Sequence, residues 1–192
     1  MAGSAPRRLG ELFAAAVDEV RLEIGFGGGE HLIHEATRLP EVGFIGVEPF
    51  QNSLANAVAW LQEIGLANVR LHDDDAGPLL DWLPAASLAR IDLLYPDPWP
   101  KPRHWKRRFV KPENLDRIAR ALQPGGAFRF ASDVPSYVAW TIREVARHGG
   151  LTWTRDSIEA CRSPWPDWPG TRYEAKALGQ GRPPAYLTFV KP

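Results

Sequence analysis

The chain has 192 residues with 23 Lys and Arg against 23 Asp and Glu, a formal net charge of zero that is untypical of a nucleic-acid binder. Hydrophobic residues make up 44% of the sequence, which is typical of a single globular domain with a sizeable core. No apolar run is long enough to span a bilayer, the N-terminus lacks the apolar core of a secretory signal, and the single Cys161 can form no internal disulfide, which together predict a cytoplasmic protein with no membrane partner.

Hydrophobic periodicity predicts helices that alternate with strands along the whole chain. Strands are predicted at residues 20–24, 43–47, 68–71, 91–95, 127–131, 151–155 and 185–190. Helices are predicted at residues 9–18, 30–38, 54–61, 115–122 and 134–148. Residues 161–182, rich in proline, are expected to be irregular.

This alternation is typical of an α/β domain in which helices cover both faces of a mostly parallel sheet. We expect one domain over residues 1–192, with residues 1–19 as a short N-terminal helical segment. In such sheets ligands bind outside the carboxyl ends of the strands, near the point where the strand order reverses. Five predicted strand ends carry a glycine turn or a carboxylate, and the sequence therefore predicts a site along this edge, at Gly25, Glu48, Asp75, Asp97 and Asp133.

Residues 25–29 form a glycine-rich turn directly after the first predicted strand. Gly25 and Gly27 would let a ligand approach the backbone closely. Position 30 is Glu, so the turn lacks the third glycine of the dinucleotide fingerprint. Glu23 would also repel a pyrophosphate. A cationic ligand without phosphate, such as S-adenosylmethionine, therefore suits this turn better than NAD does.

Two further strand ends supply acids that suit a nucleoside. Glu48 could accept hydrogen bonds from both ribose hydroxyls, although a solvated Glu at a strand end is about as common. Asp75 could accept a hydrogen bond from an adenine amino group. Spacing alone does not decide which of Asp73, Asp74 and Asp75 points inward, and the others would be solvated helix caps.

Residues 91–111 join a short apolar strand to a proline-rich and then a basic segment. Asp97 lies between two prolines, which predicts a stiff, extended loop because proline restricts itself and the residue before it. Residues 101–111 hold six cations and no acid, which leaves 17 cations against 23 acids elsewhere. Such a concentration predicts a phosphate-binding surface formed by Lys101, Arg103, Lys106, Arg107, Arg108 and Lys111.

Several short motifs follow one another along nearly the whole chain. They are Glu-Ile-Gly-Phe-Gly-Gly-Gly (23–29), Gly-Val-Glu (46–48), Asp-Ala (75–76), Tyr-Pro-Asp-Pro-Trp-Pro-Lys (95–101), Arg-His-x-Lys-Arg-Arg (103–108), Ala-Ser-Asp (131–133) and Thr-Arg-Tyr-Glu (171–174). In this order they resemble the tRNA (guanine-N7)-methyltransferase family. Many methyltransferases share the glycine motif, whereas the Pro-Asp-Pro-Trp and Thr-Arg-Tyr-Glu segments are much more specific.

The resemblance implies a Rossmann-like class I methyltransferase with a mostly parallel seven-stranded sheet. It implies methyl transfer from S-adenosylmethionine to N7 of a guanine in the tRNA variable loop, at position 46. Asp97 is then the candidate catalytic residue, which either stabilises the charge appearing on the guanine or orients its edge by hydrogen bonds. The implied cofactor residues are Glu23, Gly25, Gly27, Glu48, Asp75 and Asp97, and the implied tRNA contacts are Lys101, Arg103, Lys106, Arg107, Arg108, Asp133, Thr171, Arg172, Tyr173 and Glu174.

Some side chains keep a structural alternative. Asp133 is equally suited to cap the helix predicted at 134–148. Trp165 and Trp168 could stack on exposed bases or pack the loop that contains them. His31 and His34 lie one helical turn apart, but no set of Cys or carboxylate ligands completes a metal site, so none is expected.

Two other functions are compatible with the sequence. One is methylation of an amino group, because Pro-Asp-Pro-Trp resembles the Asp-Pro-Pro-aromatic motif of amino-group methylases, although Trp99 directly follows Pro98. The other is RNA binding without catalysis, against which Glu23, Glu48 and Asp97 together argue. The zero net charge and the short segment before the first strand suggest that RNA affinity is lower or is shared with a second subunit. A monomer or a homodimer is expected.

Overall fold

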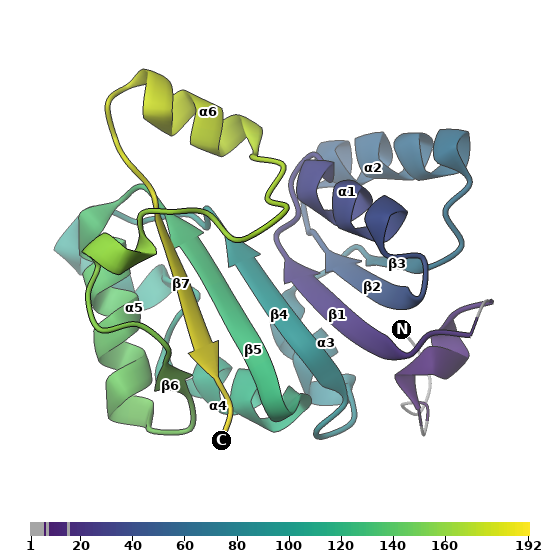
Figure 1. Cartoon of the computed structure of the whole chain (residues 1–192), viewed down its shortest axis with the longest axis horizontal. Helices are drawn as coiled ribbons and strands as arrows, with labels where there is room; N and C mark the ends of the chain where they lie inside the picture. Colours follow the sequence, from purple (N-terminus) through teal and green to yellow (C-terminus); the bar gives the residue numbers. More distant parts are fainter. Residues whose placement is uncertain (1–5, 7, 15) are drawn as a thin grey trace.

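The computed structural model describes residues 6, 8–14 and 16–192, and its strands join in one sheet. The order is β3-β2-β1-β4-β5-β7-β6, and β7 runs antiparallel to its neighbours. Figure 1 shows the ends of the parallel strands meeting at one edge. The predicted mostly parallel seven-stranded sheet is confirmed, with strands β1 (Glu19–Ile24), β2 (Val42–Val47), β3 (Val69–His72), β4 (Leu88–Leu94), β5 (Leu122–Ser132), β6 (Thr152–Trp153) and β7 (Ala185–Val190).

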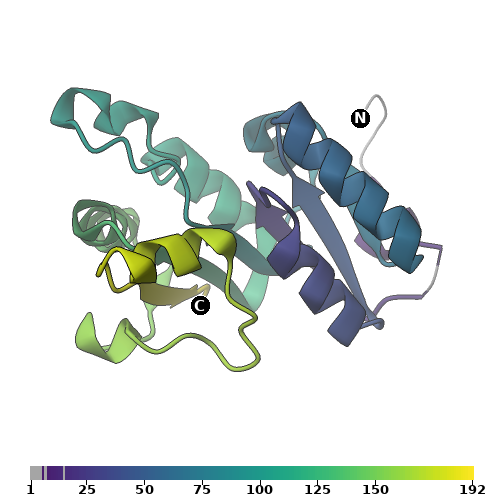
Figure 2. The ribbon, with the colours of Figure 1, turned by 90° about the horizontal axis from the view of Figure 1, so that it is seen from above.

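Helices cover both faces of this sheet, as predicted. Successive residues of a strand point to opposite faces: Phe44 of β2 packs with the first two helices, whereas Ile45 belongs to the core that the next three helices cover. Figure 2 shows the molecule from above, with the last helix beside the start of the first. The helices are α1 (Glu30–Arg38), α2 (Gln51–Ile64), α3 (Ala76–Trp82), α4 (Pro112–Ala121), α5 (Pro135–His148) and α6 (Arg172–Gly179), with short 3-10 turns at Leu9–Leu12, Pro102–Arg107 and Glu159–Cys161.

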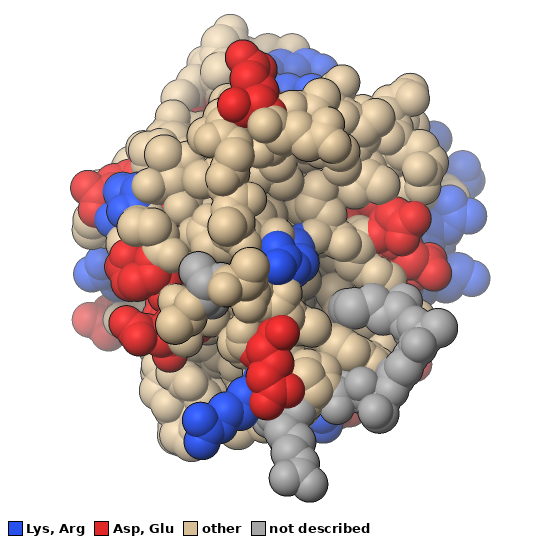
Figure 3. Space-filling model, turned by 90° about the vertical axis from the view of Figure 1, so that its right-hand side faces the viewer, with Lys and Arg blue, Asp and Glu red and all other residues tan. Residues whose placement is uncertain are grey.

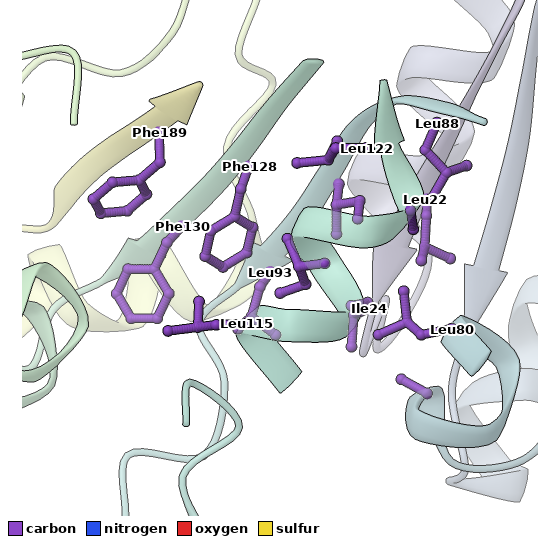
Figure 4. Packing of buried hydrophobic residues seen from close by; sticks show 14 of the residues in the cluster. Leu22, Ile24, Leu80, Leu88, Leu93, Leu115, Leu122, Phe128, Phe130 and Phe189 are labelled. Atoms are coloured by element: carbon purple, nitrogen blue, oxygen red, sulfur yellow. The ribbon is translucent and has the colours of Figure 1, made fainter. Parts of the chain in front are cut away.

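The main core lies between the sheet and the helices α3, α4 and α5. Leu22 of β1, Leu93 of β4 and Phe128 of β5 point into it, as Figure 4 shows. All three side chains are at most 2% exposed. Burying such side chains is the main term that favours folding, so the edge of the sheet is held on a rigid base.

The opposite face of β1 and β4 is charged where α1 crosses it. Glu35 of α1 accepts hydrogen bonds from Arg90 at 2.8 Å and from Arg38 at 2.9 Å, and Arg90 also donates to Asp92 at 2.8 Å. Burial raises the pKa of Glu35, but the hydrogen bonds and charge of the arginines outweigh it and lower this pKa to about 2. The alternation of charged and apolar residues in these strands therefore reflects a charged face, and not exposure to solvent.

Several predictions for the elements were wrong in part, and the strand predicted at 151–155 is only the two-residue β6, Thr152–Trp153. The helix predicted at 9–18 is only a 3-10 turn at Leu9–Leu12, and residue 15 of that prediction, like residues 1–5 and 7 of the N-terminal segment, lies outside the described residues. Strand β5 begins at Leu122, at the end of α4, and not at residue 127. The segment 161–182 contains helix α6, and α3 was missed because Gly77 and Pro78 weaken the helical signal.

Gly46 of β2 allows the closest packing of α1 on the sheet. A Cβ atom on Gly46 would lie 2.6 Å from Cδ2 of Leu32 and 2.7 Å from Cδ1 of Phe26. We expect Gly46→Ala to lower the free energy of unfolding by about 2 kcal/mol, because both contacts are overpacked. Urea denaturation measures this change. Gly179→Ala, where the new Cβ meets nothing within 4 Å, is the control and should not lower stability.

The side of the molecule beyond β3 and α2 is sparsely charged. Figure 3 shows mainly uncharged surface there, with isolated acidic and basic groups. Helix α2 carries Glu63 as its one charged residue and exposes Val58, Trp60 and Ile64. Among the described residues, this side therefore shows no continuous run of cations. No helix within the described residues is long and apolar enough to cross a membrane.

Candidate active site

A cavity of about 600 Å³ opens at the carboxyl edge of the sheet, between β1 and β4. Strand order reverses at this point. From β1, the chain adds β2 and β3 on one side, and then β4 and β5 on the other side. Ligands of open α/β sheets bind at such a switch point. The cavity brings together many of the residues predicted from the sequence, and its walls include Gly25, Gly27, Glu48, Phe50, Asp75, Asp97, Arg172 and Tyr173.

The glycine turn forms the floor of this cavity. Gly25, Gly27 and Gly29 have φ angles of 70°, 57° and 87°. These values lie in the left-handed region, where a side chain costs energy, so glycine is required for this turn. Gly29 immediately precedes α1, and its backbone N–H donates to the carbonyl of Phe26 at 2.9 Å. The turn therefore exposes backbone, rather than side chains, to a ligand.

Glu48 is fixed in place by two backbone groups. Its Oε2 accepts the N–H of Gly27 at 2.9 Å and its Oε1 accepts the N–H of Phe50 at 3.0 Å. The side chain is only 9% exposed. The carboxylate thus joins the glycine turn to the start of α2, and the remaining lone pair of each oxygen can face the cavity.

Asp75 is the acid of the triplet 73–75 that reaches the cavity. It lies at the N-terminus of α3, where its Oδ1 accepts the N–H of Gly77 at 2.9 Å. Asp73 and Asp74 are exposed and do not line the cavity. The structure therefore answers a question that sequence spacing left open, and Asp75 is both a helix cap and part of the wall.

Asp97 lies at a strained corner after β4. Tyr95 and Trp99, two residues to either side, have φ angles of 49° and 42°. Such angles are unusual for large side chains and cost about 1–3 kcal/mol each, so the surrounding structure must hold them. The predicted extended loop is wrong beyond this corner, since Pro102–Arg107 forms a 3-10 turn. Asp97 itself is exposed and lines the cavity.

Glu23 differs from the other predicted cofactor residues. It is 4% exposed, does not line the cavity, and lies 2.7 Å from Nδ1 of His31 through its Oε2. Burial raises the pKa of Glu23, a shift that the nearby His31 opposes. Glu23 therefore lies behind the glycine turn rather than on its ligand side.

The Thr-Arg-Tyr-Glu segment divides into three structural roles. Thr171 caps α6, accepting the N–H of Glu174 at 3.1 Å on its Oγ1. Arg172 and Tyr173 reach the cavity, where a Cβ on Gly27 would lie 3.4 Å from Cε2 of Tyr173. Glu174 is buried. The Thr-x-x-Glu spacing is that of a capping box, and this signal in the sequence could have revealed α6.

Four of the six cations of the basic segment are exposed, whereas Lys111 is half-buried beside Glu113 and Arg108 is buried. The side chains of Lys101, Arg103, Lys106 and Arg107 are exposed, and Arg107 stacks on the ring of Trp99 at 4.7 Å. Arg108 is 1% exposed and donates hydrogen bonds to the carbonyls of Pro98 and Ser136. Its prediction as an RNA contact does not agree with this burial, because Arg108 has no surface to offer a phosphate.

The side chain of Asp133 does not cap α5. It accepts a hydrogen bond from Arg182 at 2.7 Å, whereas the backbone N–H of Val134 is bonded to Ser132. The prediction of a cap at Asp133 was therefore wrong. Arg182 lies between α6 and β7, so this ion pair fastens the connection before β7 to the start of α5.

The two tryptophans of the proline-rich segment pack it against the sheet. Trp165 donates to Oγ1 of Thr188 at 2.9 Å, and Trp168 donates to Oε2 of Glu174 at 2.5 Å. Their rings contact each other and Tyr186. Both rings are only half-buried, but these contacts favour the packing alternative over stacking on RNA bases.

Comparison with known proteins agrees with this geometry. A family described as "Putative methyltransferase" matches residues 18–186. Among solved structures, the 16S rRNA methyltransferase KamB has a TM-score of 0.68 at 19% identity, covering 99% of this chain and 96% of its own. The precorrin-6y C5,15-methyltransferase of Geobacter metallireducens has a TM-score of 0.62 at 15% identity, covering 99% and 93%. At these identities the likeness shows the class I methyltransferase fold alone.

Curated relatives are much more similar in sequence. The tRNA (guanine-N(7)-)-methyltransferase of Agrobacterium fabrum (strain C58 / ATCC 33970) is 60% identical over 186 residues, which cover 97% of this chain and 80% of the relative. The protein of the same name from Azorhizobium caulinodans is 59% identical over 180 residues, covering 94% and 78%. Family match and identity over most of both chains lead to one conclusion: the chain belongs to the tRNA (guanine-N(7)-)-methyltransferase family of enzymes.

Proposed function

We propose that this enzyme transfers a methyl group from S-adenosylmethionine to N7 of guanine 46 in the variable loop of tRNA, in the cytoplasm. One observation carries the proposal: Glu48, Asp75 and Asp97 line a single cavity at the strand switch point, directly before the exposed basic segment. A cavity with an acidic wall suits a cationic cofactor without phosphate. A cationic segment beside it suits an RNA backbone.

The residues of the cavity fit the parts of S-adenosylmethionine. Glu48 would accept the ribose hydroxyls, because its position is fixed by Gly27 and Phe50. Asp75 would accept a hydrogen bond from the adenine amino group, and the exposed ring of Phe50 would cover the base. The open backbone of Gly25 and Gly27 would border the methionyl part. When bound, the cofactor supplies an electrophilic methyl group on a positively charged sulfur.

This reaction requires the protein only to position the reactants and to stabilise positive charge. N7 of guanine carries an in-plane lone pair and no proton, so no general base is needed. As the N–C bond formed and the S–C bond broke, positive charge would pass to the purine, and the sulfur would keep the bonding electron pair as a neutral thioether. The Asp97 carboxylate would favour that charge, and the rigid corner at Tyr95 and Trp99 would hold it in place.

The tRNA would approach from the side of the basic segment. Lys101, Arg103, Lys106 and Arg107 would contact its phosphates. Around the cavity, Asp133 and the four residues Thr171–Glu174 would position the guanine; Arg172 and Tyr173 are the two of these that line the cavity. Glu174 would act indirectly, because it is only 8% exposed.

Removal of cations from the basic segment should change the salt dependence of tRNA binding. We expect Arg103→Ala and Lys106→Ala each to weaken binding and to reduce the slope of log K against log[salt] by about 1. Both side chains are exposed, so a loss of tRNA affinity would reflect fewer counterions released on binding, and not a folding defect. Filter binding at several salt concentrations measures the slope. An unchanged slope in the double variant would place the RNA elsewhere.

Methyl transfer with identification of the product tests the proposal as a whole. The protein is given tRNA that lacks modifications together with S-adenosylmethionine labelled in the methyl group. Reduction and aniline treatment then cleave the chain at 7-methylguanosine, which identifies both the base and its position. Cleavage at the variable-loop guanine is expected. Label at another base, or in a mixture that contains no tRNA, would contradict the proposed substrate.

A further inference from the structure

His31 occupies the first turn of α1, directly behind the glycine turn. Its Nδ1 lies 2.7 Å from Oε2 of Glu23, and both residues are 4% exposed. Glu23 belongs to β1, two residues before Gly25. This buried contact therefore fixes a carboxylate just behind the backbone that borders the cavity.

The charges around this pair keep it together. Arg90 and Asp92 of β4 and Glu35 of α1 are the other charged groups that act on it. Burial lowers the pKa of His31, but the Glu23 carboxylate outweighs burial and leaves the pKa raised. Burial at the same time raises the pKa of Glu23. The contact of 2.7 Å therefore joins two buried polar groups that each satisfy the other.

The opposite side of the His31 ring faces the segment that carries α6. Its centroid lies 5.0 Å from that of the Trp168 ring, at an interplanar angle of 42°. Trp168 in turn donates to Oε2 of Glu174 at 2.5 Å, and Glu174 also accepts the hydroxyl of Tyr186. A continuous line of contacts thus runs from Glu23 through His31 and Trp168 to Glu174.

We propose that His31 is a positioning residue that fixes both sides of the reaction site. One ring nitrogen holds Glu23 behind the cofactor turn. The ring itself supports Trp168, which holds α6 so that Arg172 and Tyr173 line the cavity. The inference rests on the proposed function, because it assigns the two sides to S-adenosylmethionine and to the guanine of tRNA.

Two substitutions separate these contacts. His31→Phe keeps a ring against Trp168 and removes the nitrogen that bonds Glu23. We expect it to weaken the binding of S-adenosylmethionine about tenfold and to change the Kd of tRNA by less than about twofold. His31→Asn keeps a donor at the position of Nδ1 and removes the ring. We expect it to weaken the binding of tRNA about fivefold and to leave the Kd of the cofactor within about twofold of the wild-type value.

The measurements are the Kd of S-adenosylmethionine by calorimetry and the Kd of unmodified tRNA by filter binding, with the melting temperature of each variant. His34→Asn is the matched control, because His34 lies on the same helix and bonds the backbone carbonyl of Asp167, whereas the contacts to Glu23 and to the ring of Trp168 belong to His31. Both Kd values should stay within about twofold of the wild type in this control.

A second route avoids substitutions at His31 should they prevent folding. Trp168→Phe keeps a ring beside His31 and removes the donor to Glu174, and it should reproduce the tRNA defect alone. Equal weakening of both ligands in every variant, or no weakening in any, would overturn the proposal and leave His31 a packing residue. Wild-type protein that binds both ligands but transfers no methyl would contradict the proposed function only, since the Kd values still decide the role of His31.

Discussion

We expect kcat for methyl transfer to fall by about a thousandfold when Asp97 is replaced by Ala. The carboxylate lines the cavity, where under the proposed function positive charge would pass from the cofactor to the guanine. A group that meets this charge only as it develops contributes to the rate and little to ground-state binding. The Kd of S-adenosylmethionine should therefore change by less than about threefold.

Single-turnover kinetics with labelled cofactor, combined with calorimetry, separate these quantities. Asp97→Asn distinguishes the two roles of Asp97: an amide keeps one acceptor for the guanine edge but loses the negative charge. Activity near that of the wild type in Asp97→Asn would favour orientation of the guanine over charge stabilisation. Asp73→Asn is the matched control, because Asp73 is exposed and does not line the cavity. Loss of cofactor affinity as large as the loss of kcat would make Asp97 a binding residue only.

Arg108→Ala should lower the free energy of unfolding by about 3 kcal/mol. The guanidinium donates to the carbonyls of Pro98 and Ser136 at 3.0 Å each and to Oγ of Ser136 at 3.1 Å. The rings of Trp105 and Tyr137 lie 4.7 Å from it. Removing the side chain leaves two part-buried carbonyls without these donors and a gap between the rings, and both effects destabilise the protein.

Arg107→Ala provides the comparison for Arg108, because the two residues are adjacent and only Arg107 is exposed. We expect Arg107→Ala to leave stability within about 0.5 kcal/mol and to weaken tRNA binding. Urea denaturation gives the first quantity and filter binding the second. Equal stability of the two variants would show that the packing around Arg108 contributes little. A reduced salt slope without lost stability in Arg108→Ala would restore it as a phosphate contact.

The sequence predicted the elements whose signals are local. The glycine turn, α1 and β7 lie where periodicity and turn chemistry placed them, with α1 and β7 matching the predicted ranges residue for residue. Glu48, Asp75 and Asp97 were expected at one edge because parallel strands end together, and the cavity contains all three. A pattern of this kind predicts which end of a strand a side chain occupies.

Patterns do not predict which side chain the tertiary structure buries. Arg108 belongs to the same run of cations as Arg107, but contacts from α5, distant in sequence, help to bury it. Glu23 was expected beside the cofactor, but it does not line the cavity and lies 2.7 Å from His31, a contact that no motif indicates. In α6 the prolines before it obscured a capping signal that depends on just two residues.

The antiparallel direction of β7 has a consequence for how this enzyme can change over evolution. Strands β6 and β7 are neighbours in the sheet, and their pairs Thr152–Val190 and Trp153–Phe189 alone set the register. Residues 154–184 join them: Thr154 and Trp165 bond Thr188 of β7, and Arg172 and Tyr173 reach the cavity, whereas a short turn would suffice to connect antiparallel neighbours. Insertions, deletions or exchanges within this connection can therefore alter which nucleotide is accepted while the scaffold that binds the methyl donor stays the same.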